Sequence, residues 1–395
     1  MKTIISRSLV RKIILCFSFV SIGLVSSSKT TTLTLDSTMV VSVLTCTPGS
    51  ELYSTFGHSA IRIRSVIYGS QGYDIIYNYG TFDGYQDGFY MKFARGKLDY
   101  SLSRYDFKDF NSEYLNEGRG VTEQVLDLSV DESNHLFLLL EENYKPENRN
   151  YRYDFFYDNC ATRIEQILRK ATHGKLEITD VHADQYTFRS AIDTYLKHHP
   201  WSDYGIDLAL GLPCDKKMAY GQSMFLPDSV FKRLAEAKID GRPLIGSTEE
   251  ILLPEVTETE PTIFSPLNVN IAWLLVCVIV GLIFLKKRKY YIMTDRLTMF
   301  FTGIIGLVLV FLWFFTDHTA TAYNFNLLWA NPINLVIAVL PSTKLLKWRK
   351  YITTYMAVLG LLLICWYFLP QRLHIAVIPI VLALLFAGVR LMRTR

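Results

Sequence analysis

Residues 266–285 read PLNVNIAWLLVCVIVGLIFL, and this apolar stretch divides the chain into two parts of different composition. It is long enough to cross a bilayer as a helix, which takes about 20 residues. Four further apolar stretches follow at residues 297–316, 326–341, 351–369 and 373–391. The third is interrupted by Asn326, Asn331 and Asn334, but the charges of its flanking loops favour a span there as well. The sequence therefore predicts an all-α transmembrane bundle of five helices within residues 266–395.

Basic residues lie on one side of the predicted bundle. The loops after the first and third stretches contain KKRK at residues 286–289 and KLLKWRK at residues 344–350, whereas residues 317–325 contain no Lys or Arg. Positively charged loops stay in the cytoplasm. We therefore expect a multi-pass protein whose C-terminus is cytoplasmic and whose residues before 266 lie outside the cytoplasm.

The N-terminus has the features of a secretory signal peptide. Basic residues precede an apolar run at residues 13–25, and SSS follows at residues 26–28. This order is typical of a signal peptide, which we predict at residues 1–28, with an uncleaved anchor as the alternative. The chain carries +4 overall, and residues 286–395, with 13 Lys or Arg and 2 Asp or Glu, carry +11, so residues 1–285 carry −7. An acidic exported part argues against nucleic-acid binding.

Residues 29–245 have the pattern of one mixed α and β domain. Strands are predicted at residues 39–46, 58–65, 73–79, 98–104 and 121–128, and helices at residues 131–145 and 160–170. Residues 246–265 are acidic and contain proline, so we interpret them as a linker to the membrane.

Two residues of the exported part are candidates for chemistry. Cys160 follows Asp158 and Asn159 and begins an apolar-periodic segment, which predicts a helix capped just before the cysteine. A helix N-terminus favours the thiolate over the thiol. His58 begins the alternating strand HSAIRIRS and is a candidate base for such a nucleophile. The structural alternatives are a small buried cysteine and a surface histidine.

The chain resembles a known family in three stretches. LTCTPGSELYSTFGHSAIRI, YNYGTFDG and YDFFYDNCATRIEQIL are similar to the Lnb family, bacterial membrane lipoprotein N-acyltransferases, over most of residues 40–230 and into the membrane helices. A histidine on a strand followed by a cysteine at a helix start also looks like the circularly permuted papain-like (NlpC-type) enzymes. The resemblance implies an α+β permuted papain-like domain in which Cys160 is the nucleophile and His58 the base. It puts a third member on the next strand, where Asn78 is the best candidate and Asp74 and Asp83 are alternatives.

The resemblance also implies a reaction and a place in the cell. The acyl chain of a membrane phospholipid would pass through a thioester on Cys160 to the α-amine of a diacylglyceryl-cysteine lipoprotein, without a metal or cofactor. The catalytic domain would lie on the periplasmic side of the bacterial inner membrane. The alternatives are a periplasmic cysteine hydrolase (amidase or peptidase) of cell-wall peptide or lipid, and a binding or sensing protein with a degenerate site. A multi-span bundle favours the acyltransferase over a cell-wall hydrolase.

Further residues are candidates for binding substrate. Arg163, one turn beyond Cys160, can hold a phosphate or carboxylate, and Tyr79 is an aromatic candidate for contact with an acyl chain. His318, Asn324 and Asn331 lie at the outer side of the membrane part, where polar groups either form a recess for lipid head groups or hydrogen-bond between helices.

Three cysteines are expected in the exported part, and three is an odd number. We predict that Cys46 and Cys214 form a disulfide and that Cys160 stays free.

Overall fold

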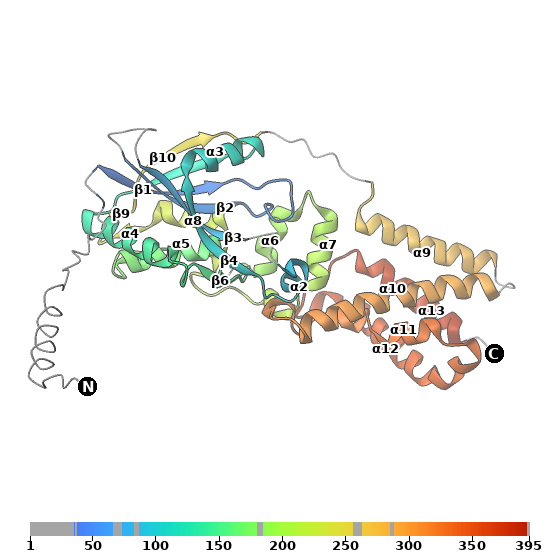
Figure 1. Cartoon of the computed structure of the whole chain (residues 1–395). Helices are drawn as coiled ribbons and strands as arrows, with labels where there is room; N and C mark the ends of the chain where they lie inside the picture. Colours follow the sequence, from blue (N-terminus) through green and yellow to red (C-terminus); the bar gives the residue numbers. More distant parts are fainter. Residues whose placement is uncertain are drawn as a thin grey trace, which may run out of the picture. The chain divides into compact units, whose positions relative to one another are not determined.

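The computed structural model describes residues 35, 38–65, 73–82, 87–179, 185–255, 263–284 and 288–392 (Figure 1). The predicted signal peptide at residues 1–28 and the candidate Asp83 lie outside the described residues.

The exported part is built on an antiparallel sheet of long and short strands in the order β10-β5-β1-β2-β3-β4-β6. Its strands are β1 (Met39–Cys46), β2 (His58–Ser65), β3 (Asp74–Thr81), β4 (Asp99–Asp106), β5 (Val121–Leu126), β6 (Asn150–Arg152) and β10 (Ile245–Leu252). A small second sheet contains β7 (Leu176–Glu177), β8 (Lys238–Ile239) and β9 (Arg242–Pro243). The predicted α+β class of this part is confirmed.

Helices cover both faces of the large sheet. On one face Ile61 and Ile63 pack with Ile164 of α5 and Leu140 of α4, and on the other face Ala60 packs with residues of α3. The alternation of side chains along β2 explains this division, because successive residues of a strand point to opposite faces. The helices of the exported part are α2 (Phe89–Ala94), α3 (Phe107–Asn116), α4 (Val130–Tyr144), α5 (Cys160–Ala171), α6 (Phe188–Leu196), α7 (Pro200–Ala209) and α8 (Pro227–Glu236).

The predicted linker begins later than expected. Residues 245–252 form β10, which pairs with β5 at the edge of the sheet. Its middle residues, such as Glu249 and Glu250, are exposed, whereas Ile245, Ile251 and Leu252 at its two ends pack against the core. The linker prediction for residues 246–252 is therefore wrong.

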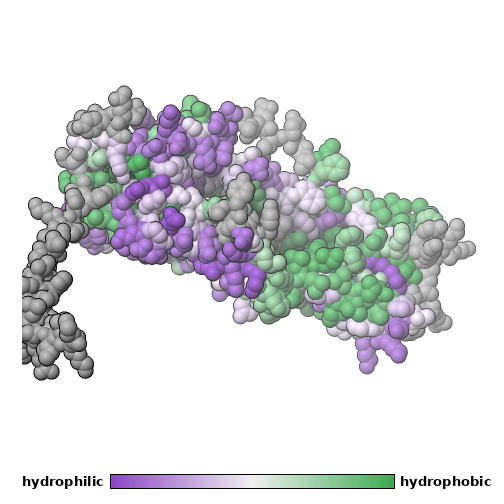
Figure 2. All heavy atoms as spheres, in the orientation of Figure 1, coloured by the Kyte–Doolittle hydropathy of each residue, from purple (hydrophilic) through white to green (hydrophobic). Residues whose placement is uncertain are grey.

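The membrane part contains two helices, within the described residues, that are long and apolar enough to cross a bilayer. They are α9 (Pro266–Ile283) and the segment Ile292–Phe314 of α10 (Arg288–Phe314). Their outward side chains are exposed and apolar, and Figure 2 shows hydrophobic side chains gathered over this part of the molecule. The remaining helices are the shorter α11 (Ile333–Val339), α12 (Arg349–Ile364) and α13 (Val377–Met392).

The third predicted span is not a full-length helix. Residues 326–341 contain part of a 3₁₀ turn, Phe325–Leu328, and then the seven residues of α11. A helix of that size is about 10 Å long, whereas the hydrocarbon core of a bilayer is about 30 Å thick. The predicted count of five spans is therefore not confirmed.

Buried asparagines explain this short segment. Asn334 donates hydrogen bonds to Thr302 Oγ1 (3.1 Å) in α10 and to Tyr355 Oη (2.9 Å) in α12. Gly306 of α10 lets the backbone approach closely, because a Cβ there would lie 2.2 Å from the carbonyl oxygen of Ala330. The polar face that interrupts the apolar stretch therefore contacts protein.

The end of α7 is held by residues of the membrane part. The last carbonyls of a helix have no partner within the helix. Asn324 donates to the oxygens of Leu208 (2.7 Å) and Ala209 (3.1 Å), and Gln371 donates to the oxygen of Leu210 (3.0 Å).

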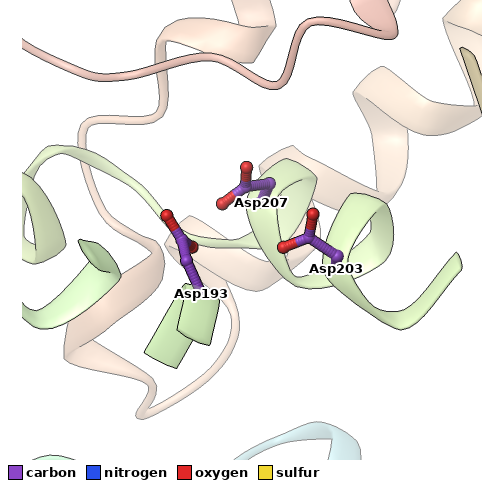
Figure 3. Close-up of side chains that lie close together, drawn as sticks. All are labelled: Asp193, Asp203 and Asp207. Carbon is purple, nitrogen blue, oxygen red and sulfur yellow. The ribbon is translucent and has the colours of Figure 1, made fainter. Parts of the chain in front are cut away.

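Three carboxylates of α6 and α7 meet close to this contact. The side chains of Asp193, Asp203 and Asp207 point toward one another, with oxygens within 4.8 Å (Figure 3). Each has a basic residue beside it: Arg372 contacts Asp193 (2.5 Å), His374 contacts Asp203 (3.3 Å) and the buried Arg189 contacts Asp207 (2.5 Å). Arg372 and His374 belong to the loop before α13, so the cluster also joins α6 and α7 to the membrane part.

Candidate functional site

The start of α5 is fixed by its capping residue. Asn159 Oδ1 accepts hydrogen bonds from the backbone N–H of Ala161 and Thr162, both at 2.9 Å, and Thr162 Oγ1 accepts from the N–H of Asn159 (2.8 Å). Asn159 Nδ2 also donates to the oxygens of Phe155 and Phe225. This reciprocal cap makes Cys160 the first residue of the helix, which confirms the prediction.

The Cys160 thiol is buried among hydrogen-bond donors. The donors near its sulfur are the backbone N–H groups of Ser59 and Ala161 and the His58 side chain. Burial raises the pKa of Cys160, but the charge of His58 and these hydrogen bonds lower it more, so the net direction is down from the usual thiol value. The site therefore favours the thiolate.

His58 is the first residue of β2, and it lies between Cys160 and Asn78. Its Nε2 is 2.6 Å from Asn78 Oδ1, and Asn78 Nδ2 donates to Tyr105 Oη (2.8 Å). Because Asn78 Oδ1 faces the ring and can only accept, Nε2 carries the proton. Nδ1 is then the ring nitrogen left for the thiol.

The pKa of His58 moves in the opposite direction to that of the thiol. Burial lowers the pKa of His58, but the Cys160 thiolate and the hydrogen bonds to Cys160 and Asn78 raise it more. The pKa values of the two groups therefore approach each other, and a proton passes readily from thiol to imidazole. The three predicted members Cys160, His58 and Asn78 are brought together in one chain of contacts.

A small space lies beside these groups, over Gly80 at the end of β3. Gly80 has φ +89°, and a Cβ built there would lie 3.6 Å from Cys160 Cβ, 3.9 Å from His58 Cε1 and 3.9 Å from Tyr151 Oη. These are ordinary contact distances, so the space is about the size of one methyl group.

Asp74, an alternative third member, lies elsewhere. It forms an ion pair with Arg62 at 2.7 Å, and the guanidinium of Arg62 lies over the ring of Phe107. It has a structural role in holding β2 to β3.

Arg163 and Tyr79 line one small pocket at the α5 surface, together with Asn143, Gln166 and Lys170. Arg163 forms two hydrogen bonds to Asp158, at 2.5 and 2.7 Å, so its charge is already partnered. The predicted substrate-binding residues Arg163 and Tyr79 are thus close together, and their role stays a prediction.

The three candidates of the membrane part have different surroundings. Asn324 is engaged by α7 as described above, which favours the alternative of hydrogen bonding within the protein. Asn331 Oδ1 accepts from the N–H of Ile333 (3.0 Å), and the ring of His318 faces Gly96. A role of His318 and Asn331 in lipid binding stays a prediction.

The predicted disulfide between Cys46 and Cys214 is not formed. Both are free thiols in separate apolar clusters, and burial raises the pKa of each to about 12. Cys214 Sγ donates to the oxygen of Ala320 (3.6 Å). The pairing prediction is wrong because an odd count of cysteines says nothing about which of them are near each other.

Sequence reasoning missed several residues of the site. Gly80 directly follows the predicted strand 73–79, but no sequence pattern marks its place beside Cys160. Tyr105 and Tyr151 come from β4 and β6, and no local pattern marks either as part of a site.

Comparison with family models adds to this geometry. Residues 27–195 match the model of the Lnb N-terminal periplasmic domain, and residues 258–394 match the model of the Lnb transmembrane domain. Searches of curated proteins and of solved structures give no match.

Proposed function

Because the chain belongs to the Lnb family of membrane proteins with a periplasmic N-terminal domain, we propose that it is a lipoprotein N-acyltransferase. Its nucleophile is Cys160, its base is His58, and Asn78 orients the base. The observation that carries this proposal is the contact chain from a capped helix N-terminus through imidazole to amide. Thiol acyl transfer needs a nucleophile, a base within hydrogen-bond reach and a group that orients the base.

In the first half-reaction the acyl donor is a membrane phospholipid. The Cys160 thiolate attacks the carbonyl carbon of an acyl ester, and a tetrahedral intermediate forms. The bond to the glycerol oxygen then breaks, His58 gives its proton to that oxygen, and a lysophospholipid leaves. The product on the enzyme is a thioester at Cys160, and no external oxidant, metal or nucleotide is needed.

In the second half-reaction the acceptor is the α-amine of a diacylglyceryl-cysteine lipoprotein. The amine nitrogen attacks the thioester carbonyl while neutral His58 takes a proton from it. The carbon–sulfur bond breaks, an amide forms, and the Cys160 thiolate and protonated His58 are restored. The cycle is therefore ping-pong and returns the enzyme to its starting state.

The membrane part fits substrates that are both anchored in lipid. We place the catalytic domain on the periplasmic side of the bacterial inner membrane and the C-terminus in the cytoplasm, following the charge bias of the loops. Arg163, Tyr79 and Lys170 line the pocket that we assign to the phospholipid head group, and His318 and Asn331 are candidates for contacts nearer the bilayer.

Mass spectrometry of lipoprotein N-termini tests the proposal. Cells that carry the wild-type chain should show an amide-linked acyl chain at the N-terminal cysteine, and cells with Cys160→Ser should show a free α-amine. Cys214→Ser is the matched control, because Cys214 is also buried but lies in another cluster. A free α-amine with the wild-type chain, or acylation that survives Cys160→Ser, would refute the proposal.

A second measurement separates the transferase from a hydrolase. The wild-type protein in phospholipid vesicles should release lysophospholipid in proportion to the amide formed when a diacylglyceryl-cysteine peptide is present. Release of free fatty acid at the same rate with and without the peptide would identify water as the acceptor and favour the periplasmic hydrolase.

A further inference from the structure

Tyr151 carries a buried hydroxyl group that nothing in the proposed chemistry has used. Its side chain is only 9% exposed, and Tyr151 Oη has no hydrogen-bond partner among the described residues. Leaving a buried hydroxyl without a partner costs free energy, and such groups in native proteins call for an explanation.

The hydroxyl borders the space over Gly80. Tyr151 Oη and His58 Cε1 both lie 3.9 Å from the position of a Cβ at Gly80, and Cys160 Cβ lies 3.6 Å from it. An unpartnered donor, the nucleophile and the base thus surround one methyl-sized volume. The carbonyl oxygen of an acyl group attacked by the thiolate fits in such a volume.

The ring is held firmly in this position. Tyr151 lies on β6 and pairs with Tyr100 of β4, and its ring meets the ring of Tyr79 edge to face. The guanidinium of Arg163 lies 3.7 Å above the centre of the ring. A donor fixed by its surroundings before substrate arrives needs no reorganisation during the reaction.

The hydroxyl also keeps its proton beside the thiolate. Burial raises the pKa of Tyr151 far above the ordinary phenol value, and the negative charge of Cys160 raises it further. Tyr151 is therefore a donor at every pH at which the thiolate is present.

We propose that Tyr151 is a catalytic residue whose hydroxyl donates a hydrogen bond to the acyl carbonyl oxygen, in the space over Gly80, as that oxygen becomes an oxyanion. This inference rests on the proposed thiol acyl transfer and deepens it. The substrate it selects is a carbonyl compound with an sp² oxygen, such as an ester or a thioester. The same donor acts in both half-reactions, because each passes through a tetrahedral intermediate at Cys160.

The test compares two reactions of the same thiol in the purified full-length protein in detergent. A p-nitrophenyl ester acylates Cys160 through a tetrahedral oxyanion, and the release of p-nitrophenolate follows the step. Iodoacetamide alkylates Cys160 by displacement of iodide, with no oxyanion. Tyr151→Phe should slow acylation about 100- to 1,000-fold, the usual effect of losing one oxyanion donor, and leave alkylation unchanged.

Tyr144→Phe is the matched control. Tyr144 packs against the same apolar cluster, and the guanidinium of Arg104 lies over its ring at 4.6 Å. Tyr151→Phe should fold as the wild type does, since it breaks no hydrogen bond among the described residues. Tyr144→Phe likewise removes only a hydroxyl group and should fold normally. Tyr144→Phe should acylate at the wild-type rate.

Two results would overturn the inference. One is acylation of Tyr151→Phe within threefold of the wild-type rate. The other is an equal loss of alkylation and acylation, because the hydroxyl would then act on the ionisation of Cys160 rather than on the carbonyl. Failure of the proposed function gives different results. A wild-type thiol that is alkylated but never acylated refutes both the acyltransferase and the role of Tyr151. Acylation followed only by hydrolysis refutes the acyltransferase but leaves the role of Tyr151 as oxyanion donor supported, provided Tyr151→Phe slows that acylation.

Discussion

Replacing Asn78 with alanine tests whether the third member of the site orients and charges the base. Asn78 Oδ1 accepts from His58 Nε2 at 2.6 Å, and Asn78 is buried. A hydrogen bond to a charged group contributes about 1.5–3 kcal/mol. Each 1.4 kcal/mol corresponds to a factor of ten in rate, so Asn78→Ala should lower the rate constant for Cys160 acylation by about 10- to 150-fold.

The same substitution should change the pH dependence in a defined direction. The hydrogen bond from His58 to Asn78 raises the pKa of His58, so its loss moves the basic limb of the pH–rate profile to lower pH. The positive charge of His58 also lowers the pKa of Cys160. A less stable imidazolium weakens this effect, so the pKa of Cys160 rises and the acid limb moves to higher pH. The bell-shaped profile should therefore become narrower from both sides.

Alkylation by iodoacetamide follows the acid limb, because it reports the thiolate of Cys160 without knowledge of the natural substrate. Acylation by a p-nitrophenyl ester across the pH range follows both limbs. Asn78→Asp should recover part of the acylation rate and move the basic limb to higher pH, since a carboxylate accepts the same hydrogen bond and stabilises the imidazolium. Asn148→Ala, which removes an exposed amide bonded to Glu142, is the control. An Asn78→Ala protein with an unchanged profile and a rate within threefold of wild type would refute this account of the site.

Other predictions follow from the same geometry. Gly80→Ala adds a methyl group 3.6 Å from Cys160 Cβ at φ +89°, so acylation should fall at least tenfold while circular dichroism stays unchanged; a wild-type rate would contradict the assigned carbonyl position. Asn159→Ala removes a helix cap and two hydrogen bonds to backbone oxygens. The free energy of unfolding, measured with denaturant in detergent, should therefore fall by about 3 kcal/mol. Alkylation of the unreduced, denatured protein should modify both Cys46 and Cys214, and mass spectrometry counts the modified cysteines. If both stayed unmodified, the two residues would form a disulfide after all.

The catalytic chain of contacts could be predicted because each member has a local signature. Cys160 follows a capping asparagine, His58 opens an alternating strand, and Asn78 lies on the next predicted strand. Tyr151 could not be predicted in the same way. Its strand has three residues, too few for any periodicity, and its position depends on pairing with β4, which is remote in sequence.

The membrane part and the sheet edge were harder to predict for a related reason. Hydropathy averages a window of sequence, so it takes no account of tertiary hydrogen bonds. The cost of burying the Asn334 amide is offset by its hydrogen bonds to Thr302 and Tyr355 on two other helices. Strand β10 is exposed along most of its length, and it joins the sheet through its ladder to β5. In both places the deciding hydrogen bonds come from distant parts of the chain.

The short helix α11 has a consequence for how the protein is made. Seven residues offer the insertion machinery too little apolar surface to enter a bilayer independently, and the polar backbone at each end of the helix has no lipid partner. Its hydrogen-bond partners Thr302 and Tyr355 lie on α10, which precedes it, and on α12, which is synthesised after it. The hydrogen bond from Asn334 to Tyr355 therefore forms only once α12 has emerged from the ribosome, so the final fixing of segment 325–340 is a late step of biogenesis.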